Sequence, residues 1–178
     1  MLRFDESSAE CLVLTFKEGL LSAMAHDLVI RVTSFALEVD EAERAVEGRF
    51  AAGSLRVLHA LHDDVETPTS ERDRQQIEES IRREVLDSDR HPEIRFRSSR
   101  VDEQSGRFAL RGVLEIRGVT REIRATVEQV GGHWVGEALV HQPDFGIRPY
   151  TAFLGALKVK PDVRVRITVA ATALREVR

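Results

Sequence analysis

Strict alternation of apolar and charged residues is the feature that most restricts how this chain can fold. Between Gly112 and Val127, apolar residues such as Leu114 fall on one side of an extended chain, and charged residues such as Glu115 fall on the other. A period of two is typical of a β-strand with one face in a core and one face in water. The same alternation is found over residues 93–99, 107–118, 121–128 and 162–173.

Short polar loops connect the alternating segments. The Gly-containing loops at 102–107, 117–120 and 130–133 predict three consecutive hairpins, and therefore an antiparallel meander. Weaker strand patterns occupy residues 11–17, 27–39, 44–51, 54–58 and 133–141. In the segment 27–39 the apolar face changes sides near Thr33–Ser34, which predicts a β-bulge there.

One amphipathic helix is predicted from Glu71 to about Leu86. Ser70 precedes it with Asp73 three residues later, which is the spacing of a capping box. The helix offers the i,i+4 ion pairs Glu78–Arg82 and Glu79–Arg83. Its apolar stripe is narrow, so we expect one edge to pack against another part of the molecule and the rest to face water. The stripe consists of Ile77, Ile81, Val85 and Leu86.

Composition limits the function classes. The 178 residues form a single predicted domain (1–178), and the net charge of -4 argues against binding of nucleic acid. The one cysteine, Cys11, excludes an intramolecular disulfide and lies in an apolar run, which predicts a small buried side chain. We find no apolar segment of membrane-spanning length and no leader pattern, so the expected location is cytoplasmic.

Many antiparallel strands and one helix predict an all-β fold with one or two short helices, either a closed barrel or a two-layer sandwich. Small residues such as Gly112, Ala125 and Gly136 occupy inward positions and favour a barrel with room for a ligand, although a filled core remains an alternative. A hydrocarbon lining selects an apolar guest, because a polar guest loses its water without replacement hydrogen bonds.

Three segments resemble the YceI-like family. They are HPEIRFRSSRV (91–101), GVLEIRGVTREI (112–123) and QPDFGI (142–147), followed by a closing strand after Pro161. The likeness covers roughly His91 to Ala173. It implies an extended antiparallel lipocalin-like β-barrel that encloses a polyisoprenoid or a related amphiphilic lipid, such as a quinone or fatty-acyl chain. It implies binding or carriage, without an established chemistry and without a cofactor.

We predict that a lipid ligand contacts the inner faces of the strands. His26 follows an apolar segment at the start of a strand, and is a candidate for head-group recognition at the barrel mouth. The loop from Gln142 to Val159 is either a flap over the mouth or a loop that packs its own aromatic residues. The predicted contacts are Phe16, His26, Leu28, Ile30, Phe96, Leu110, Leu114, Ile116, Val127, Trp134, Phe145, Phe153 and Ile167.

Two other function classes remain open. The first is a ligand-free interaction module with a filled core and a charged working surface, and the second is an enzyme that uses His26. We find no catalytic motif, and His59 and His62 are expected to be solvated loop residues rather than metal ligands. A sheet edge near the N-terminus could pair with a second copy in a homodimer.

Overall fold

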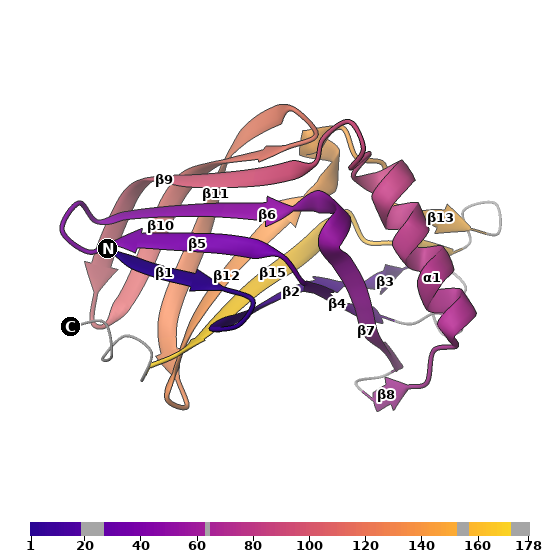
Figure 1. Ribbon diagram of the computed structural model, residues 1–178, viewed down its shortest axis with the longest axis horizontal. Helices are drawn as coiled ribbons and strands as arrows, with labels where there is room; N and C mark the ends of the chain where they lie inside the picture. The colour runs from indigo at the N-terminus through magenta and orange to yellow at the C-terminus, as the bar shows by residue number, and fades with distance from the viewer. Residues whose placement is uncertain (19–26, 63–64, 153–156, 172–178) are drawn as a thin grey trace.

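The fold is dominated by one large antiparallel sheet (Figure 1). The computed structural model describes residues 1–18, 27–62, 65–152 and 157–171. In these ranges twelve strands are ordered β1-β5-β6-β9-β10-β11-β12-β15-β2-β4-β7-β8. The strands are β1 (Leu2–Asp5), β2 (Ala9–Thr15), β4 (Asp27–Val32), β5 (Phe35–Asp40), β6 (Ala45–Ala51), β7 (Leu55–His62), β8 (Val65–Thr67), β9 (Glu93–Gln104), β10 (Arg107–Ile116), β11 (Val119–Val130), β12 (His133–His141) and β15 (Asp162–Ala170).

The meander from β9 to β12 confirms the three predicted hairpins. Each loop has two central residues with positive φ: 52° and 77° at 105–106, 52° and 71° at 117–118, and 55° and 80° at 131–132. Such loops match the right-handed twist of the strands that they join, and glycine adopts positive φ without steric cost. The turn chemistry therefore fixes the register of this half of the sheet.

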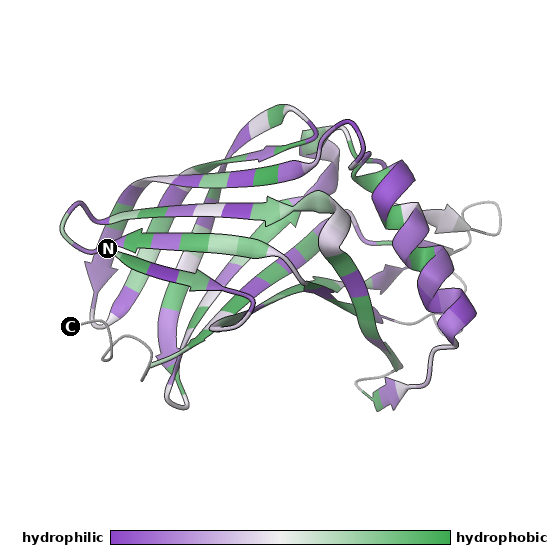
Figure 2. Ribbon diagram, viewed as in Figure 1, coloured by the Kyte–Doolittle hydropathy of each residue, from purple (hydrophilic) through white to green (hydrophobic). Residues whose placement is uncertain are grey.

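Alternation along the strands separates the two faces of the sheet. On β10, Leu110, Leu114 and Ile116 are buried, while Arg111 and Val113 between them are exposed. Figure 2 shows the same alternation of hydrophobic and hydrophilic residues along neighbouring strands. The sheet curls strongly around its apolar face into a half-barrel. This shape confirms the predicted all-β, lipocalin-like fold and excludes the alternative of a two-layer sandwich.

A corner replaces the predicted bulge at Thr33–Ser34. The chain there leaves β4, which pairs with β2 and β7, and enters β5, which pairs with β1 and β6. Ser54 fastens the corner, because its carbonyl accepts from Thr33 N–H at 3.0 Å and its hydroxyl accepts from Ser34 N–H at 3.2 Å. The same hydroxyl donates to Ala51 O at 2.8 Å. The change of face is thus a change of strand partners.

Helix α1 (Glu71–Ser80) crosses one end of the curled sheet (Figure 1). Its predicted cap is confirmed, since Ser70 Oγ accepts from Asp73 N–H at 3.1 Å. The helix continues as one π-turn (Ile81–Val85), where Leu86 N–H donates to Ile81 O at 2.9 Å.

The predicted pair Glu79–Arg83 is present, but the predicted pair Glu78–Arg82 is wrong. Arg82 instead binds Glu79 and Asp89. Glu78 accepts a hydrogen bond from Val57 N–H on β7 at 2.8 Å. A helix packed on a sheet edge can satisfy an edge N–H, and this tertiary bond takes precedence over the local pair.

Three further strands form a small sheet at the same end of the molecule as α1. Their order is β13 (Thr151–Ala152), β14 (Leu157–Val159) and β3 (Lys17–Glu18). Strands β13 and β14 belong to the segment 142–159, which we expected to be either a flap or a packed loop. The segment that we expected to enter a loop after Leu58 also differs from the expectation, because it continues as β7.

Ser54→Ala tests the corner. We expect it to lower the free energy of unfolding by about 1–3 kcal/mol, because it removes two hydrogen bonds from a buried site and leaves Ser34 N–H without its acceptor. Urea unfolding measures the change. The control Ser99→Ala removes an exposed 3.3 Å bond to Arg111 O and should change stability by less than about 0.5 kcal/mol. Equal losses in the two variants would show that the corner does not depend on Ser54.

Candidate ligand-binding cavities

The concave face of the sheet lines two cavities. The first, of about 640 Å³, lies beneath α1 and the three-stranded sheet, and we call it the helix-side chamber. The second, of about 490 Å³, lies toward β1 and the loops that end β5, β9 and β11, and we call it the far chamber. Both volumes are in the range of ordinary small-molecule sites.

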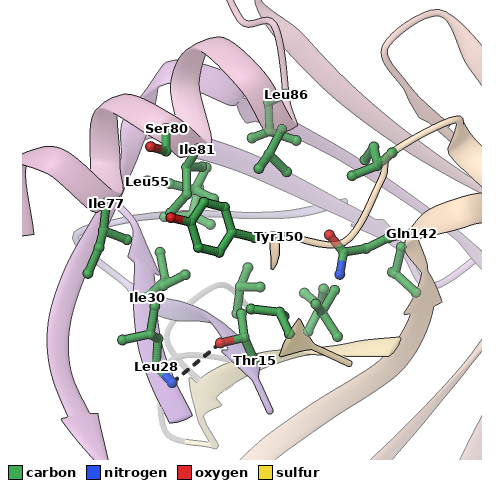
Figure 3. A pocket seen from close by; sticks show the side chains of 18 of the residues that line it. Thr15, Leu28, Ile30, Leu55, Ile77, Ser80, Ile81, Leu86, Gln142 and Tyr150 are labelled. Carbon is green, nitrogen blue, oxygen red and sulfur yellow. Dashed lines mark hydrogen bonds between the residues drawn. The ribbon is translucent and has the colours of Figure 1, made fainter. Parts of the chain in front are cut away.

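Apolar side chains from eight strands of the large sheet, from β14 and from the helical segment form most of the helix-side chamber. Figure 3 shows Ile77 and Ile81 of the helical segment facing Leu28 and Ile30 of β4 across the cavity. None of the residues of α1 is fully buried, so the helix covers a hollow rather than a solid core. The apolar residues of the lining include Cys11, Val13, Leu28, Ile30, Val32, Leu55, Ile77, Ile81, Leu86, Ile94, Ile116, Ile147, Val159 and Val163.

Polar side chains gather at the outer end of the helix-side chamber. Thr15 Oγ1 accepts from Leu28 N–H at 3.3 Å, and the amide of Gln142, which is only 7% exposed, donates to Lys160 O at 3.1 Å. Thr69 Oγ1 is buried and has no hydrogen-bond partner among the described residues. A buried hydroxyl without a partner calls for an explanation, and a bound polar group is one. The polar lining also includes Lys17, Asp73, Gln76, Ser80, Tyr150 and Lys158.

The far chamber is apolar along its length and charged at its outer end. The Trp134 indole meets the Phe108 ring edge-on, with the ring centroids 5.8 Å apart. At the outer end Arg44 lies 3.9 Å from the carboxylate of Glu103. Asp40 and Glu41 lie at the same end. The two chambers therefore carry their polar groups at opposite ends, with hydrocarbon between them.

Nine of the thirteen predicted contact residues line a chamber. Leu28, Ile30, Leu114 and Ile116 line the helix-side chamber. Phe96, Leu110, Val127, Trp134 and Ile167 line the far chamber, together with Leu114. His26 and Phe153 lie outside the described residues, so the expectations for them stay predictions.

Phe16 and Phe145 lie in neither lining. Phe16 shares the outer face of β2 with Leu14, and its ring centroid lies 5.8 Å from the guanidinium carbon of Arg164. Both faces of that strand are apolar, so alternation did not identify the inner one. Phe145 is 2% exposed, but a 3₁₀ turn (Gln142–Phe145) packs it into the core beside the chamber.

Some lining residues were missed by the sequence analysis. Ile147, Tyr150 and Val159 come from the segment that follows Phe145, and these residues line the chamber in its place. The apolar stripe of the helix was recognised, and its packing along one edge is confirmed, because Ile77, Ile81 and Val85 pack against the core. Its contact with a cavity was not predicted, because a narrow apolar stripe suits a fully packed helix equally well.

The inward glycines do not all create space. A Cβ at Gly112 would lie 2.5 Å from Phe96 Cε2 and 2.6 Å from Arg97 O, so the Phe96 ring fills the position. A Cβ at Gly136 would meet nothing closer than 3.6 Å, and this glycine lines the far chamber. The expectation that small inward residues leave volume therefore holds at Gly136 and is wrong at Gly112.

The cysteine in the helix-side chamber is not an activated nucleophile. Cys11 lines the helix-side chamber, but burial raises the pKa of its thiol to about 12, with a smaller contribution from the Glu10 carboxylate. The thiol is therefore protonated at neutral pH and is a poor nucleophile. His59 lies on β7, where its Nδ1 is 3.4 Å from Glu66, which corrects its placement in a loop. Within the described ranges no group of three His, Cys, Asp or Glu residues could hold a metal ion.

Comparison with known proteins now identifies the family. Residues 21–171 match the YceI-like domain, which is most of the chain. The chain belongs to the YceI-like family. The match confirms the resemblance seen in the meander strands and in the segment 142–147. No match was found among curated proteins.

Solved structures of the YceI-like fold agree with this assignment. Burkholderia cenocepacia BcnA shares 12% identity and a TM-score of 0.62 over 93% of this chain and 97% of BcnA. A polyisoprenoid-binding domain from Saccharophagus degradans, implicated in plant cell wall breakdown, shares 10% identity and a TM-score of 0.54 over 91% and 94%. The Campylobacter jejuni YCEI protein shares 14% identity and a TM-score of 0.53 over 75% and 76%. At these identities the likeness concerns the fold. No helix among the described residues is long and apolar enough to span a membrane.

The Cys11 thiol provides a test of the chamber wall. Because its pKa is raised from 9.0 to about 12, we expect alkylation by iodoacetamide at pH 8 to be at least about a thousandfold slower in the native protein than in urea. Mass spectrometry of timed samples measures both rates. Comparable rates would mean that the thiol is open to solvent and titrates normally.

Proposed function

We propose that this YceI-like protein binds and carries an amphiphilic lipid. The apolar chain of the lipid lies in the lumen, and its head group lies at the outer end of the helix-side chamber. The observation that carries the proposal is the distribution of polarity: two cavities with mainly apolar walls, each with a minority of polar side chains in its lining. A single amphiphilic chain is the ligand that matches a lumen of this kind.

The energetics support a ligand held mainly by hydrocarbon contact. Each buried methylene contributes about 0.8 kcal/mol, so ten of them contribute about 8 kcal/mol. Loss of translational and rotational freedom on binding opposes this by at least about 4 kcal/mol. The remainder of about 4 kcal/mol corresponds to a dissociation constant of about 1 mM, so micromolar affinity requires about five further buried methylenes or several polar contacts. The unpartnered Thr69 hydroxyl and the Gln142 amide are the polar groups best placed to meet a head group.

The family supports the same reading. The Saccharophagus degradans domain, which has this fold, is described as polyisoprenoid-binding. The alternative of a ligand-free module requires a filled core, and two cavities of several hundred Å³ count against it. The alternative of an enzyme requires His26, which lies outside the described residues, and none of the described groups supports it.

A co-purifying lipid is the direct test. We expect native mass spectrometry of the purified protein to show an adduct, and organic extraction to release an apolar molecule. Protein that carries no adduct and that also fails to bind added isoprenoid alcohols or fatty acids would contradict the proposal.

Ile77→Glu places a charge on the wall of the helix-side chamber. We expect the affinity for geranylgeraniol to fall by roughly 10- to 100-fold, because the variant loses an apolar contact worth about 1.5–3 kcal/mol. Isothermal titration calorimetry measures the affinity. No α1 residue is fully buried, so the fold should persist.

Arg72→Gln is the matched control for Ile77→Glu. It lies on the same helix, changes the net charge by the same amount, and lies in neither chamber lining. It should bind geranylgeraniol as the wild type does. Equal losses in both variants would assign the effect to overall charge and not to the chamber wall.

A further inference from the structure

The two chambers meet at a ring of apolar side chains. Four residues line both cavities, so no more than one layer of side chains separates the cavities. The four come from β6, β10, β12 and β15, and we call them the waist. They are Phe50, Leu114, Val140 and Val165.

Phe50 is the bulkiest residue of the waist, and its ring is held in place. It stacks on Phe35 with the ring centroids 6.0 Å apart and an interplanar angle of 25°. On its own strand it lies over Gly48, where a Cβ would come within 2.8 Å of Phe50 Cε2 and 2.9 Å of Cζ. The Phe50 ring thus has Phe35 on one side and the backbone of Gly48 on the other. Its remaining edge faces the lumen, and the residue is partly exposed.

The waist lies between two compartments of similar length. The helix-side chamber extends from Cys11 on β2 to Lys17 on β3, and six residues of extended chain span about 20 Å. The far chamber extends along β10 from Leu114 to Phe108, which is again about 20 Å. One leaflet of a bilayer offers an acyl chain only about 15 Å. An ordinary acyl chain thus fits within one chamber, and a chain longer than about 20 Å has to pass the waist.

The chemistry of the waist favours a single long ligand over two short ones. All four waist residues are apolar, so the middle of the lumen offers no partner to a head group. The outer end of the far chamber offers mainly carboxylates, Asp40, Glu41 and Glu103, with the guanidinium of Arg44 already beside Glu103. That end suits an anionic head group poorly, whereas the helix-side lining carries hydroxyl, amide and ammonium groups and one carboxylate, that of Asp73.

Resting on the proposed function, we infer that Phe50 determines the chain length of the single-chain lipid that the lumen accepts. A short chain ends before the waist and does not contact Phe50. A long chain threads past the Phe50 ring, so the free cross-section there decides whether the chain enters the far chamber.

The test compares two alcohols that share a head group and a repeat unit and differ in length, farnesol (short) and solanesol (long). We expect the wild type to bind solanesol more tightly than farnesol, with one solanesol per protein in native mass spectrometry. Phe50→Trp narrows the waist and should weaken solanesol binding at least tenfold, while farnesol binding changes less than twofold. Phe50→Ala widens the waist and should retain solanesol binding.

A second pair of variants keeps the test decisive if Phe50→Trp does not fold. Val165→Phe narrows the waist from the opposite wall and should reproduce the selective loss of solanesol. Val163→Phe lies two residues away on the same strand and lines only the helix-side chamber, so it should weaken both alcohols together. Thermal unfolding of every variant establishes that it is folded.

The outcomes separate the two proposals. A wild type that binds neither alcohol contradicts the proposed function. A wild type that binds solanesol, with folded Phe50→Trp and Val165→Phe variants that bind it equally well, overturns the role of Phe50 and leaves lipid binding intact. Two solanesol molecules per protein, or equal loss of both alcohols in the waist variants, also overturns the inference.

Discussion

Hydrocarbon on one face and charge on the other face of the meander strands β9 to β11 is the constraint from which the structure follows. The apolar face has to leave water, and among the described residues α1 is the one α-helix that covers it. The sheet therefore curls around its own apolar face, and α1 and the three-stranded sheet cover the end where the curl leaves a gap. Closure by curling leaves space that side chains of this size do not fill, and the chambers are the result.

The charged side chains on the outer face of the sheet specify how the strands pair, but they contribute little to the free energy of unfolding. Ion pairs such as Arg97–Glu47 and Arg166–Glu137 join neighbouring strands at 2.7 Å. Exposed pairs of this kind contribute at most about 1 kcal/mol each. A one-residue slip of any strand, however, would turn its charged residues into the lumen and its apolar residues into water. The alternating charges thus exclude wrong pairings at little gain in stability.

Features set by local chemistry were predictable from the sequence, and features set by distant partners were not. The Ser70 cap, the three hairpin loops and the inner face of β10 depend on residues a few positions apart. Glu78 departs from its predicted partner because Val57 N–H, on a strand edge, competes for its carboxylate. Phe16 was placed on the wrong face because both faces of β2 are apolar. The hollow beneath α1 could not be read from periodicity, because a narrow apolar stripe is equally compatible with a packed helix.

The incomplete burial of α1 has a consequence for the free protein. Its inner stripe, Ile77 and Ile81 above all, faces the helix-side chamber and is not fully buried by the chain itself. In the proposed carrier, the hydrocarbon of the bound lipid packs against this stripe and supplies the apolar contacts that the helix lacks in the free protein. Ligand binding and folding stability are then coupled by mass action, so that the lipid-bound protein has a larger free energy of unfolding than the free protein. Release of the lipid exposes the apolar stripe of the helix to the empty chamber.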